Sequence, residues 1–245
     1  MHRSRALLLV VVSVLVKETL CCNFYPVGEY LRFVRIPENL KVGDEVLKVE
    51  VHPRKNLSLQ PVDREEDAHL FTYRDVNRTH VSVVLAQSVD ELVDSDSPQN
   101  IVKFRLGCDF DSGDDLISAY LSVTVYIEDV NDNIPQFVDT PYHVNVDELT
   151  PTGITIFKGI RAFDRDKPNT PNSDVQYSII SGDPDSHFAL ESSHKPALVL
   201  KKALDYDAGD KEFLLVITAS DRGSPPRSSN ATVRITVQDN DDLPP

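Results

Sequence analysis

The sequence predicts an all-β protein in which two tandem sandwich domains follow a signal peptide. Three observations lead to this prediction. The N-terminus carries an apolar run that is too short to cross a membrane, strand-like runs recur through the rest of the chain, and acidic motifs repeat at a separation of about 110 residues. A chain of 245 residues has room for two domains of roughly 110–120 residues each.

The N-terminal apolar run is typical of a secretory signal peptide. Arg3 and Arg5 precede Ala6–Val16, an apolar run of 11 residues. A membrane-spanning helix needs roughly 20 residues, whereas the core of a signal peptide is about this short. We therefore expect residues 1–22 to be a signal peptide; a buried N-terminal strand or helix is the alternative.

The cysteines and the glycosylation sequons agree with a secreted chain. Cleavage after Cys21 would leave Cys22 and Cys108 as an even pair in an oxidising compartment. We expect a Cys22–Cys108 disulfide, with Cys21 as the rival partner of Cys108 and two free thiols as the alternative. Asn-x-Ser/Thr sequons, which predict N-glycosylation, begin at Asn56, Asn77 and Asn230.

The remainder of the chain is predicted to form β-strands throughout. No stretch of 12 or more residues sustains an apolar period of 3.6 residues, while β-branched or alternating runs recur between segments rich in Pro, Asn and Asp. This pattern indicates sandwiches or barrels. The predicted strands are 31–36, 46–51, 81–85, 101–106, 121–127, 142–146, 154–157, 175–180, 197–200, 213–219 and 231–237.

Acidic motifs divide this strand-rich region into two repeats. Three motifs recur in the same order at separations of 110, 111 and 109 residues. The matched residues are Glu38 with Glu148, Asp94 with Asp205, and Asn131 with Asn240. One period shared by three motifs indicates a tandem duplication whose joint is the segment 129–135.

The joint has the composition of a calcium-binding segment. The chain carries 39 acidic against 25 basic residues, a net charge of −14, which argues against a nucleic-acid partner and favours cations. The segment Asp-Val-Asn-Asp-Asn at 129–133 concentrates carboxylate and amide oxygens, the ligands that Ca²⁺ takes six to eight at a time. An EF-hand is excluded, because Asp164-Arg-Asp166-Lys-Pro168 lacks the remaining loop ligands. A solvated acidic turn is the alternative.

These motifs together resemble a pair of extracellular cadherin repeats. The shared features are the Pro-Glu, Asp-x-Asp, Asp-x-Asn-Asp-Asn-x-Pro, Asp-Arg-Asp and Ala-x-Asp-x-Gly motifs, spread over residues 30–245. The resemblance implies two seven-stranded Greek-key sandwiches at 23–134 and 135–242, with 243–245 beginning a further linker. It also implies about three Ca²⁺ ions between the repeats.

The resemblance implies ligands for two linkers. For the first linker they are Glu38, Asp94, Asp96, Asp129, the Val130 carbonyl, Asn131, Asp132, the Asn133 carbonyl, Asp164, Asp166, the Asn172 carbonyl and Asp221. For the second linker they are Glu148, Asp205, Asp207, Asp239, Asp241 and Asp242. Asp96 and Asp207 stand where the family usually has Glu, so bidentate binding there is in doubt. The second linker is half-built without a third repeat, and its occupancy stays open.

The expected function is calcium-dependent adhesion or mechanical linkage, with the first repeat as a membrane-distal tip that binds another cadherin, the same or different. The segment Glu148–Phe157, the shortened linker Asp239–Pro244 and the position of Cys108 resemble protocadherin-15 and its insect microvillar counterpart. The absence of Trp excludes exchange of N-terminal strands anchored by Trp.

We expect no small-molecule substrate. We expect the protein to lie on the extracellular side of the plasma membrane and to be attached through a membrane span outside this chain; alone, the chain would be secreted. The alternatives are a truncated decoy and a glycan-cleaving enzyme with paired carboxylates.

Overall fold

The computed structural model describes residues 23–52, 56–94, 99–111 and 116–240, which divide into two compact units between Asp129 and Val130. The boundary expected from the sequence, after residue 134, lies five residues further along. The predicted signal peptide, Cys21, Cys22, Asp96, Asp241, Asp242 and the tail 243–245 lie outside the described residues. Each unit is described by itself below.

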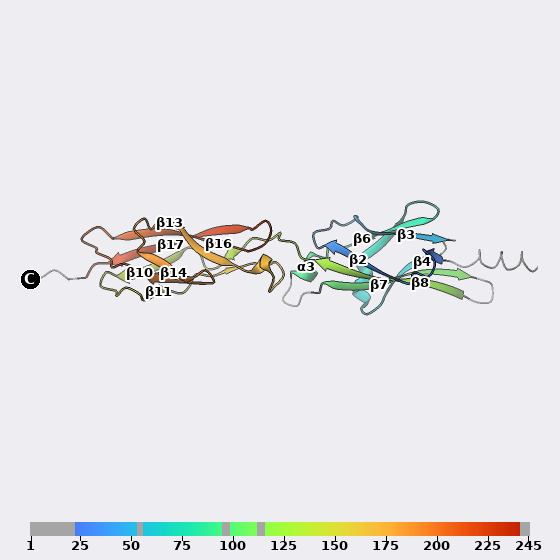
Figure 1. Ribbon diagram of the computed structural model, residues 1–245, viewed down its shortest axis with the longest axis horizontal. Helices are drawn as coiled ribbons and strands as arrows, with labels where there is room; N and C mark the ends of the chain where they lie inside the picture. The colour runs from blue at the N-terminus through green and yellow to red at the C-terminus, as the bar shows by residue number, and fades with distance from the viewer. Residues whose placement is uncertain (1–22, 53–55, 95–98, 112–115, 241–245) are drawn as a thin grey trace, which may run out of the picture. The chain divides into compact units, whose positions relative to one another are not determined.

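The first unit is a sandwich of two four-stranded sheets (Figure 1). One sheet has the strand order β1-β3-β6-β5 and the other β2-β8-β7-β4. If β1 and β2 are taken as halves of one edge strand that crosses between the sheets, seven strands remain. The strands are β1 (Asn23–Tyr25), β2 (Leu31–Pro37), β3 (Glu45–His52), β4 (Leu57–Pro61), β5 (Phe71–Asp75), β6 (His80–Leu85), β7 (Ile101–Asp111) and β8 (Leu116–Glu128).

Alternating side chains explain how these sheets face each other. In β8, Leu121, Val123, Val125 and Ile127 are buried in the core, and the residues between them face away from it. Burying each such aliphatic side chain contributes about 1.5–3 kcal/mol. Two short helices lie in the connections, α2 (Glu65–His69) and α3 (Asp90–Val93).

The second unit repeats the same topology with its own core. Its sheets are β10-β17-β16-β13, β11-β15-β14 and the short pair β12-β9. A single 3₁₀ turn, η1 (Pro171–Ser173), precedes β13. The strands are β9 (Gln136–Phe137), β10 (Tyr142–Asp147), β11 (Thr155–Phe157), β12 (Ala162–Phe163), β13 (Gln176–Ser181), β14 (Phe188–Ser192), β15 (Lys195–Leu200), β16 (Glu212–Ser220) and β17 (Ser228–Gln238).

The predicted all-β sandwich fold is confirmed, and each of the eleven predicted strands overlaps a strand of the structure. The sequence analysis missed β1, β4, β5, β9, β12 and β14, which have two to five residues each. Runs this short carry too little alternation to be recognised before their pairing partners are known. Among the described residues, no helix is long and apolar enough to cross a membrane.

Candidate metal centre

Three carboxylates of the first unit converge at one end of its sandwich. Glu38, Asp94 and Asp129 each offer a carboxylate oxygen within 4.8 Å of the others, and Glu38 is fully buried. Glu38 follows β2 and Asp129 follows β8, and these strands are parallel neighbours, so both residues leave the sheet at the same end. Asp94 directly follows α3.

This grouping favours a bound positive charge. Carboxylates within 5 Å of one another repel, and burial strengthens the repulsion. Oxygen-only donor sets of this kind suit Ca²⁺ or Mg²⁺. The structure therefore brings together three of the first-unit ligands that the sequence predicted; the fourth, Asp96, lies outside the described residues.

The second unit forms a buried acidic loop after β12. Asp164 and Asp166 are 6% and 1% exposed. The backbone N–H of Asp166 donates to Asp164 Oδ1 at 3.0 Å, which folds the loop back on itself. Asn133 holds Asp166 in place, since its backbone N–H and its Nδ2 donate to Asp166 Oδ1 at 3.0 and 2.8 Å.

A third buried carboxylate of the second unit, Asp221, lies in the loop between β16 and β17. Asp221 Oδ1 accepts hydrogen bonds from Asn131 Nδ2 at 3.1 Å and from the Gly223 backbone N–H at 2.9 Å. The backbone N–H of Arg227 lies 3.0 Å from both Asp221 oxygens. These donors fix the carboxylate in one orientation.

Gly223 is a functional position that the sequence analysis did not single out. A Cβ at Gly223 would lie 2.2 Å from Asn131 Nδ2 and 2.7 Å from Asn172 Oδ1, so these side chains would have to move to admit it. Glycine therefore allows Asn131 and Asn172 to lie close to the Asp221 loop. The sequence signal was the Gly two residues after a predicted ligand, in Ala-Ser-Asp-Arg-Gly.

Two oxygens of this region fit a cation ligand set. Asn131 Oδ1 and Asp164 Oδ2 are buried and accept no hydrogen bond from any described residue. Buried acceptors without a donor are rare, and a bound cation is one of the few groups that satisfies them. Because the Asn131 amide nitrogen already donates to Asp221 and to the Pro225 carbonyl, its oxygen is the atom left for a ligand role.

The electrostatics of Asp164 agree with this fit. Burial raises the pKa of the Asp164 carboxyl from its usual 3.8 to about 6, and the charges of Asp166 and Asp221 add to the rise. Hydrogen bonds from the Asp166 and Arg165 backbone N–H groups counteract only part of it. The chain therefore holds Asp164 where ionisation is unfavourable unless a cation is close.

Of the remaining predicted ligands of the first linker, Val130, Asp132 and Asn133 lie in the segment that follows Asp129. Asp132 is half-buried, and its Oδ1 accepts a hydrogen bond from Asn133 Nδ2 at 3.1 Å. Asn172 lies in η1, with its Oδ1 next to Gly223. Ligand roles for Asp132, Asn172 and the Val130 and Asn133 carbonyls stay predictions.

The predicted second linker has a different arrangement in the described residues. Glu148 Oε1 accepts the Asn240 backbone N–H and Oε2 accepts that of Tyr206, both at 2.7 Å. Asp205 and Asp207 are exposed, and Asp205 Oδ1 accepts the Ala208 backbone N–H at 2.7 Å. Asp239 is also exposed. In the part of the chain that the structure describes, no group of three carboxylates forms around Glu148.

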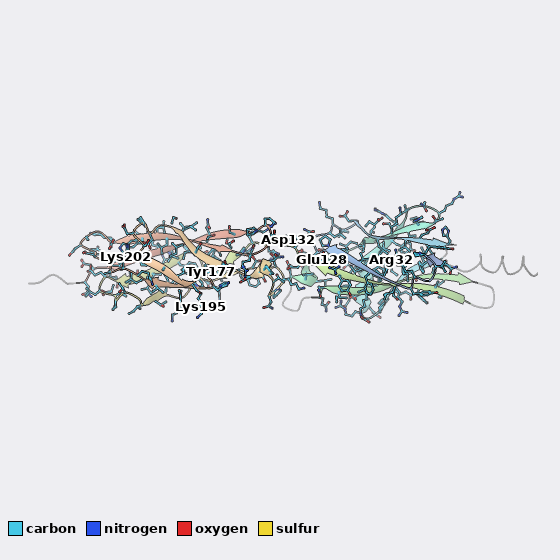
Figure 2. The ribbon with its side chains drawn as sticks, viewed as in Figure 1. Arg32, Glu128, Asp132, Tyr177, Lys195 and Lys202 are labelled. Carbon is cyan, nitrogen blue, oxygen red and sulfur yellow. The ribbon has the colours of Figure 1, made fainter. Side chains whose placement is uncertain are left out.

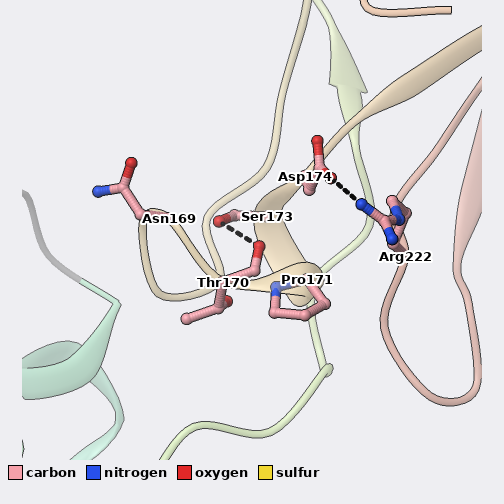
Figure 3. A pocket seen from close by; sticks show the side chains of 6 residues that line it. All are labelled: Asn169, Thr170, Pro171, Ser173, Asp174 and Arg222. Carbon is pink, nitrogen blue, oxygen red and sulfur yellow. Dashed lines mark hydrogen bonds and ion pairs between the residues drawn. The ribbon is translucent and has the colours of Figure 1, made fainter.

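A shallow pocket beside η1 offers no catalytic pair. Its lining residues are Asn169, Thr170, Pro171, Ser173, Asp174 and Arg222 (Figure 3). Asp174 is the only carboxylate among them, and it already pairs with Arg222 at 2.9 Å. Glycosidases need two carboxyl groups that face one space. The pocket gives the enzyme alternative no support.

The predicted modification sites are described in part. Cys108 is fully buried and disulfide-bonded, while its predicted partners, Cys22 or Cys21, lie outside the described residues. Asn56, Asn77 and Asn230 are exposed, as glycosylation requires. The pairing and the glycans themselves stay predictions.

Comparison with known proteins identifies the repeats. The cadherin-domain family model matches residues 142–238. Cadherin-89D of Drosophila melanogaster is 46% identical over 224 residues, which are 89% of this chain and 10% of that protein. Cadherin-99C of Drosophila melanogaster is 35% identical over 140 residues, 51% of this chain and 8% of the relative. The chain thus spans about a tenth of the length of these relatives.

Solved structures show the same architecture over both units. The crystal structure of Drosophila N-cadherin EC1-4 superposes with a TM-score of 0.71 at 26% identity, covering 89% of this chain and 50% of that one. Human protocadherin-24 EC1-2 superposes with a TM-score of 0.67 at 22% identity, covering 89% of this chain and 98% of that one. The second likeness concerns the fold alone.

The finer resemblance to protocadherin-15 is wrong, since the identity of 46% is with Cadherin-89D. The features behind that expectation were the segment 148–157, the short second linker and Cys108, which are too few to separate branches of a superfamily with shared motifs. The wider resemblance is confirmed. The chain belongs to the cadherin superfamily of non-enzymatic adhesion proteins and carries two extracellular cadherin repeats.

Proposed function

We propose that this chain is a calcium-dependent adhesion or mechanical-linkage module, whose acidic joint becomes rigid when Ca²⁺ binds. The observation that carries the proposal is the pair of buried acceptors, Asn131 Oδ1 and Asp164 Oδ2, beside the buried carboxylates Asp166 and Asp221. Such a set is costly in a protein that binds no cation.

The residues of each unit would have distinct tasks. Glu38, Asp94 and Asp129 would supply carboxylates from the first unit, and Asp164, Asp166 and Asp221 from the second. When bound, Ca²⁺ supplies positive charge that neutralises these groups. The backbone donors of Gly223 and Arg227 hold Asp221 ready, so little conformational freedom is lost on binding.

Sharing of ions between the two sets is the proposed source of stiffness. Eight predicted carboxylates against about three Ca²⁺ would leave a net charge of about −2 at the joint. Without metal the same carboxylates repel, and the joint should lose its fixed geometry. The first repeat would then act as the tip that binds another cadherin ectodomain, on the extracellular side of the plasma membrane.

Thermal unfolding with and without calcium tests the metal part of this proposal. We expect millimolar Ca²⁺ to raise the Tm of the wild-type chain by several degrees, because ligands that bind only the folded state stabilise it. Asp164→Asn keeps an acceptor for the Asp166 N–H but removes the charge, and should lose most of this rise.

Asp185→Asn, in an exposed loop, is the matched control and should keep the full response. An unchanged Tm in wild type on adding Ca²⁺ would contradict the proposal. So would an equal rise in wild type and Asp164→Asn.

A further inference from the structure

Two histidines and one glutamate meet on the outer face of sheet β1-β3-β6-β5 in the first unit. In β3, Glu50 and His52 are two residues apart and therefore share a face of the sheet. His80 of β6 is the cross-strand partner of Glu50. The opposite face of these strands is the core side, where Val51 and Val81 are fully buried. We call Glu50, His52 and His80 the histidine cluster.

The side chains of the histidine cluster lie close enough to share one metal ion. His52 Nε2 lies 2.9 Å from Glu50 Oε1, and His80 Nε2 lies 3.9 Å from Glu50 Oε2. Ligand atoms on one Zn²⁺ lie about 3–3.5 Å apart, since each Zn–N or Zn–O bond is about 2.0–2.2 Å long. The three ligand atoms do not yet all lie within 4.8 Å of one another, so a small rotation of the side chains would complete the set. These side chains are 32–42% exposed, and an ion can reach them from solvent.

The residues before His80 determine which nitrogen of its ring can bind a metal. Asn77 Oδ1 accepts the backbone N–H groups of Thr79 and His80 at 2.8 and 2.9 Å, and it accepts the Thr79 hydroxyl at 3.0 Å. His80 Nδ1 lies 2.8 Å from Thr79 Oγ1 and 3.3 Å from Asn77 Oδ1. These partners assign the ring proton to Nδ1 and the lone pair to Nε2. A hydrogen bond from the second ring nitrogen orients metal-binding histidines in the same way.

The Glu50 carboxylate is not neutralised by a basic side chain. Among the described residues, its ion pairs are with the two histidines and with no Lys or Arg. Arg32, labelled in Figure 2, reaches the same strand and donates to the Lys48 carbonyl at 3.2 Å, but its Nε pairs with Glu29 at 2.9 Å. Neutral His80 and Glu50 therefore present two acceptors to each other, 3.9 Å apart. A proton on His80 Nε2 or a metal ion between the two atoms would satisfy both.

The corresponding sheet of the second unit has no such cluster. That sheet consists of β11, β15 and β14, and none of these strands contains a histidine. The sandwich can therefore be built without imidazoles on this face, and the histidine cluster has a cause other than the fold.

The sequon at Asn77 is compatible with a metal in the histidine cluster. A glycan is attached to the amide nitrogen of Asn, whereas the contacts that orient His80 use Asn77 Oδ1. Asn77 is exposed, so a glycan can extend into solvent.

We propose that the histidine cluster binds one Zn²⁺ ion through the Glu50 carboxylate, His52 Nε2 and His80 Nε2. Two imidazoles favour Zn²⁺ over Ca²⁺, which takes oxygen ligands. The fourth tetrahedral position would hold water. His52 Nε2 donates to Glu50 in the metal-free chain, so its proton would move to Nδ1 when the ion binds. The ion would join β3 to β6, and it goes beyond the proposed function because it uses none of the predicted calcium ligands.

Isothermal titration of the secreted chain with Zn²⁺ tests the proposal. Millimolar Ca²⁺ is present throughout, because it competes for sites made of oxygen ligands alone. We expect one Zn²⁺ per chain with a Kd of about 10 µM or tighter, and a Kd at least roughly tenfold higher for His80→Gln and for Glu50→Gln. His194→Gln is the matched control. His194 pairs with a single carboxylate, that of Asp174 at 3.3 Å, so this variant should bind Zn²⁺ like wild type.

A second measurement uses the wild type alone and does not depend on the folding of any variant. Diethyl pyrocarbonate modifies neutral imidazoles, and mass spectrometry locates the modified residues. Bound Zn²⁺ should slow the modification of His52 and His80 several-fold, because their Nε2 lone pairs would then be used by the ion. The modification of His194 should not change.

Three results would overturn the proposal. One is a wild type that binds no Zn²⁺ more tightly than about 100 µM in the presence of Ca²⁺. The others are equal Zn²⁺ affinities of wild type, His80→Gln and Glu50→Gln, and equal protection of His80 and His194. Both cluster variants should keep the wild-type Tm response to Ca²⁺. Zn²⁺ binding that depends on the cluster, in a chain whose Tm ignores Ca²⁺, would support this site and refute only the calcium module.

Discussion

Glu38 and Glu148 hold the same place in the two repeats, yet their surroundings differ. Each follows the strand that pairs in parallel with the last strand of its sandwich, and each is buried. Glu38 lies within 4.8 Å of two other carboxylates, whereas the two oxygens of Glu148 accept backbone N–H groups of Tyr206 and Asn240. Among the described residues, three carboxylates thus gather at Glu38 and none gathers with Glu148, whose oxygens accept backbone N–H groups.

A buried Glu at the end of the strand that pairs in parallel with the last strand therefore does not by itself determine what its carboxylate binds. The loops next to the carboxylate determine which groups it contacts. In the first unit, α3 ends at Val93 and places Asp94 beside Glu38. In the second unit, the corresponding Asp205 is exposed and caps its own turn through the Ala208 N–H. In metal-free protein, Glu148→Ala and Glu38→Gln should therefore change the unfolding free energy in opposite directions.

Glu148→Ala should produce the largest effect. It removes a charged acceptor from two partly buried backbone donors, which should lower the unfolding free energy of metal-free protein by about 1–3 kcal/mol. Urea unfolding in EDTA measures this. Glu191→Ala, a change at an exposed strand position, is the control and should be nearly neutral. A loss no larger than that of the control would show that Glu148 is not a cap.

Gly223→Ala tests the close approach in the second unit. The new methyl group would displace Asn131, so we expect a loss of about 1–3 kcal/mol in unfolding free energy and a weaker response of the Tm to Ca²⁺. Ser224→Ala, at the exposed neighbour, should change neither quantity. A Gly223→Ala variant with wild-type stability and calcium response would mean that the loop relaxes without cost.

More of the fold than of the candidate site could be predicted from the sequence. Alternation in β8 and β17 follows directly from the side chains, while β9 and β12 have two residues each and exist only because they pair with each other. Asp164 and Asp221 could be proposed as candidate ligands because their motifs are local. The cap on Glu148 could not, because Tyr206 and Asn240 supply backbone groups that leave no trace in residue type.

Glu38→Gln should act in the opposite direction to Glu148→Ala. It removes one of three clustered charges and keeps the shape, so metal-free protein should gain about 1 kcal/mol of unfolding free energy. The gain in unfolding free energy should disappear in millimolar Ca²⁺, because the Glu38 carboxylate would then bind the ion. Urea unfolding in EDTA and in Ca²⁺ measures both. Destabilisation of the metal-free protein by Glu38→Gln would remove the contrast between the two glutamates.

The pH dependence of metal-free stability tests whether the buried carboxylate of Asp164 is costly to ionise without a cation. The pKa of Asp164 is raised from 3.8 to about 6, so the folded state binds its proton more tightly than the unfolded state. The cost of ionising Asp164 is therefore fully present above about pH 6 and absent below about pH 4. Wild type should gain stability relative to Asp164→Asn as the pH falls through this window. Parallel stability curves for the two proteins in EDTA would show that Asp164 titrates normally and that its burial needs no cation to offset it.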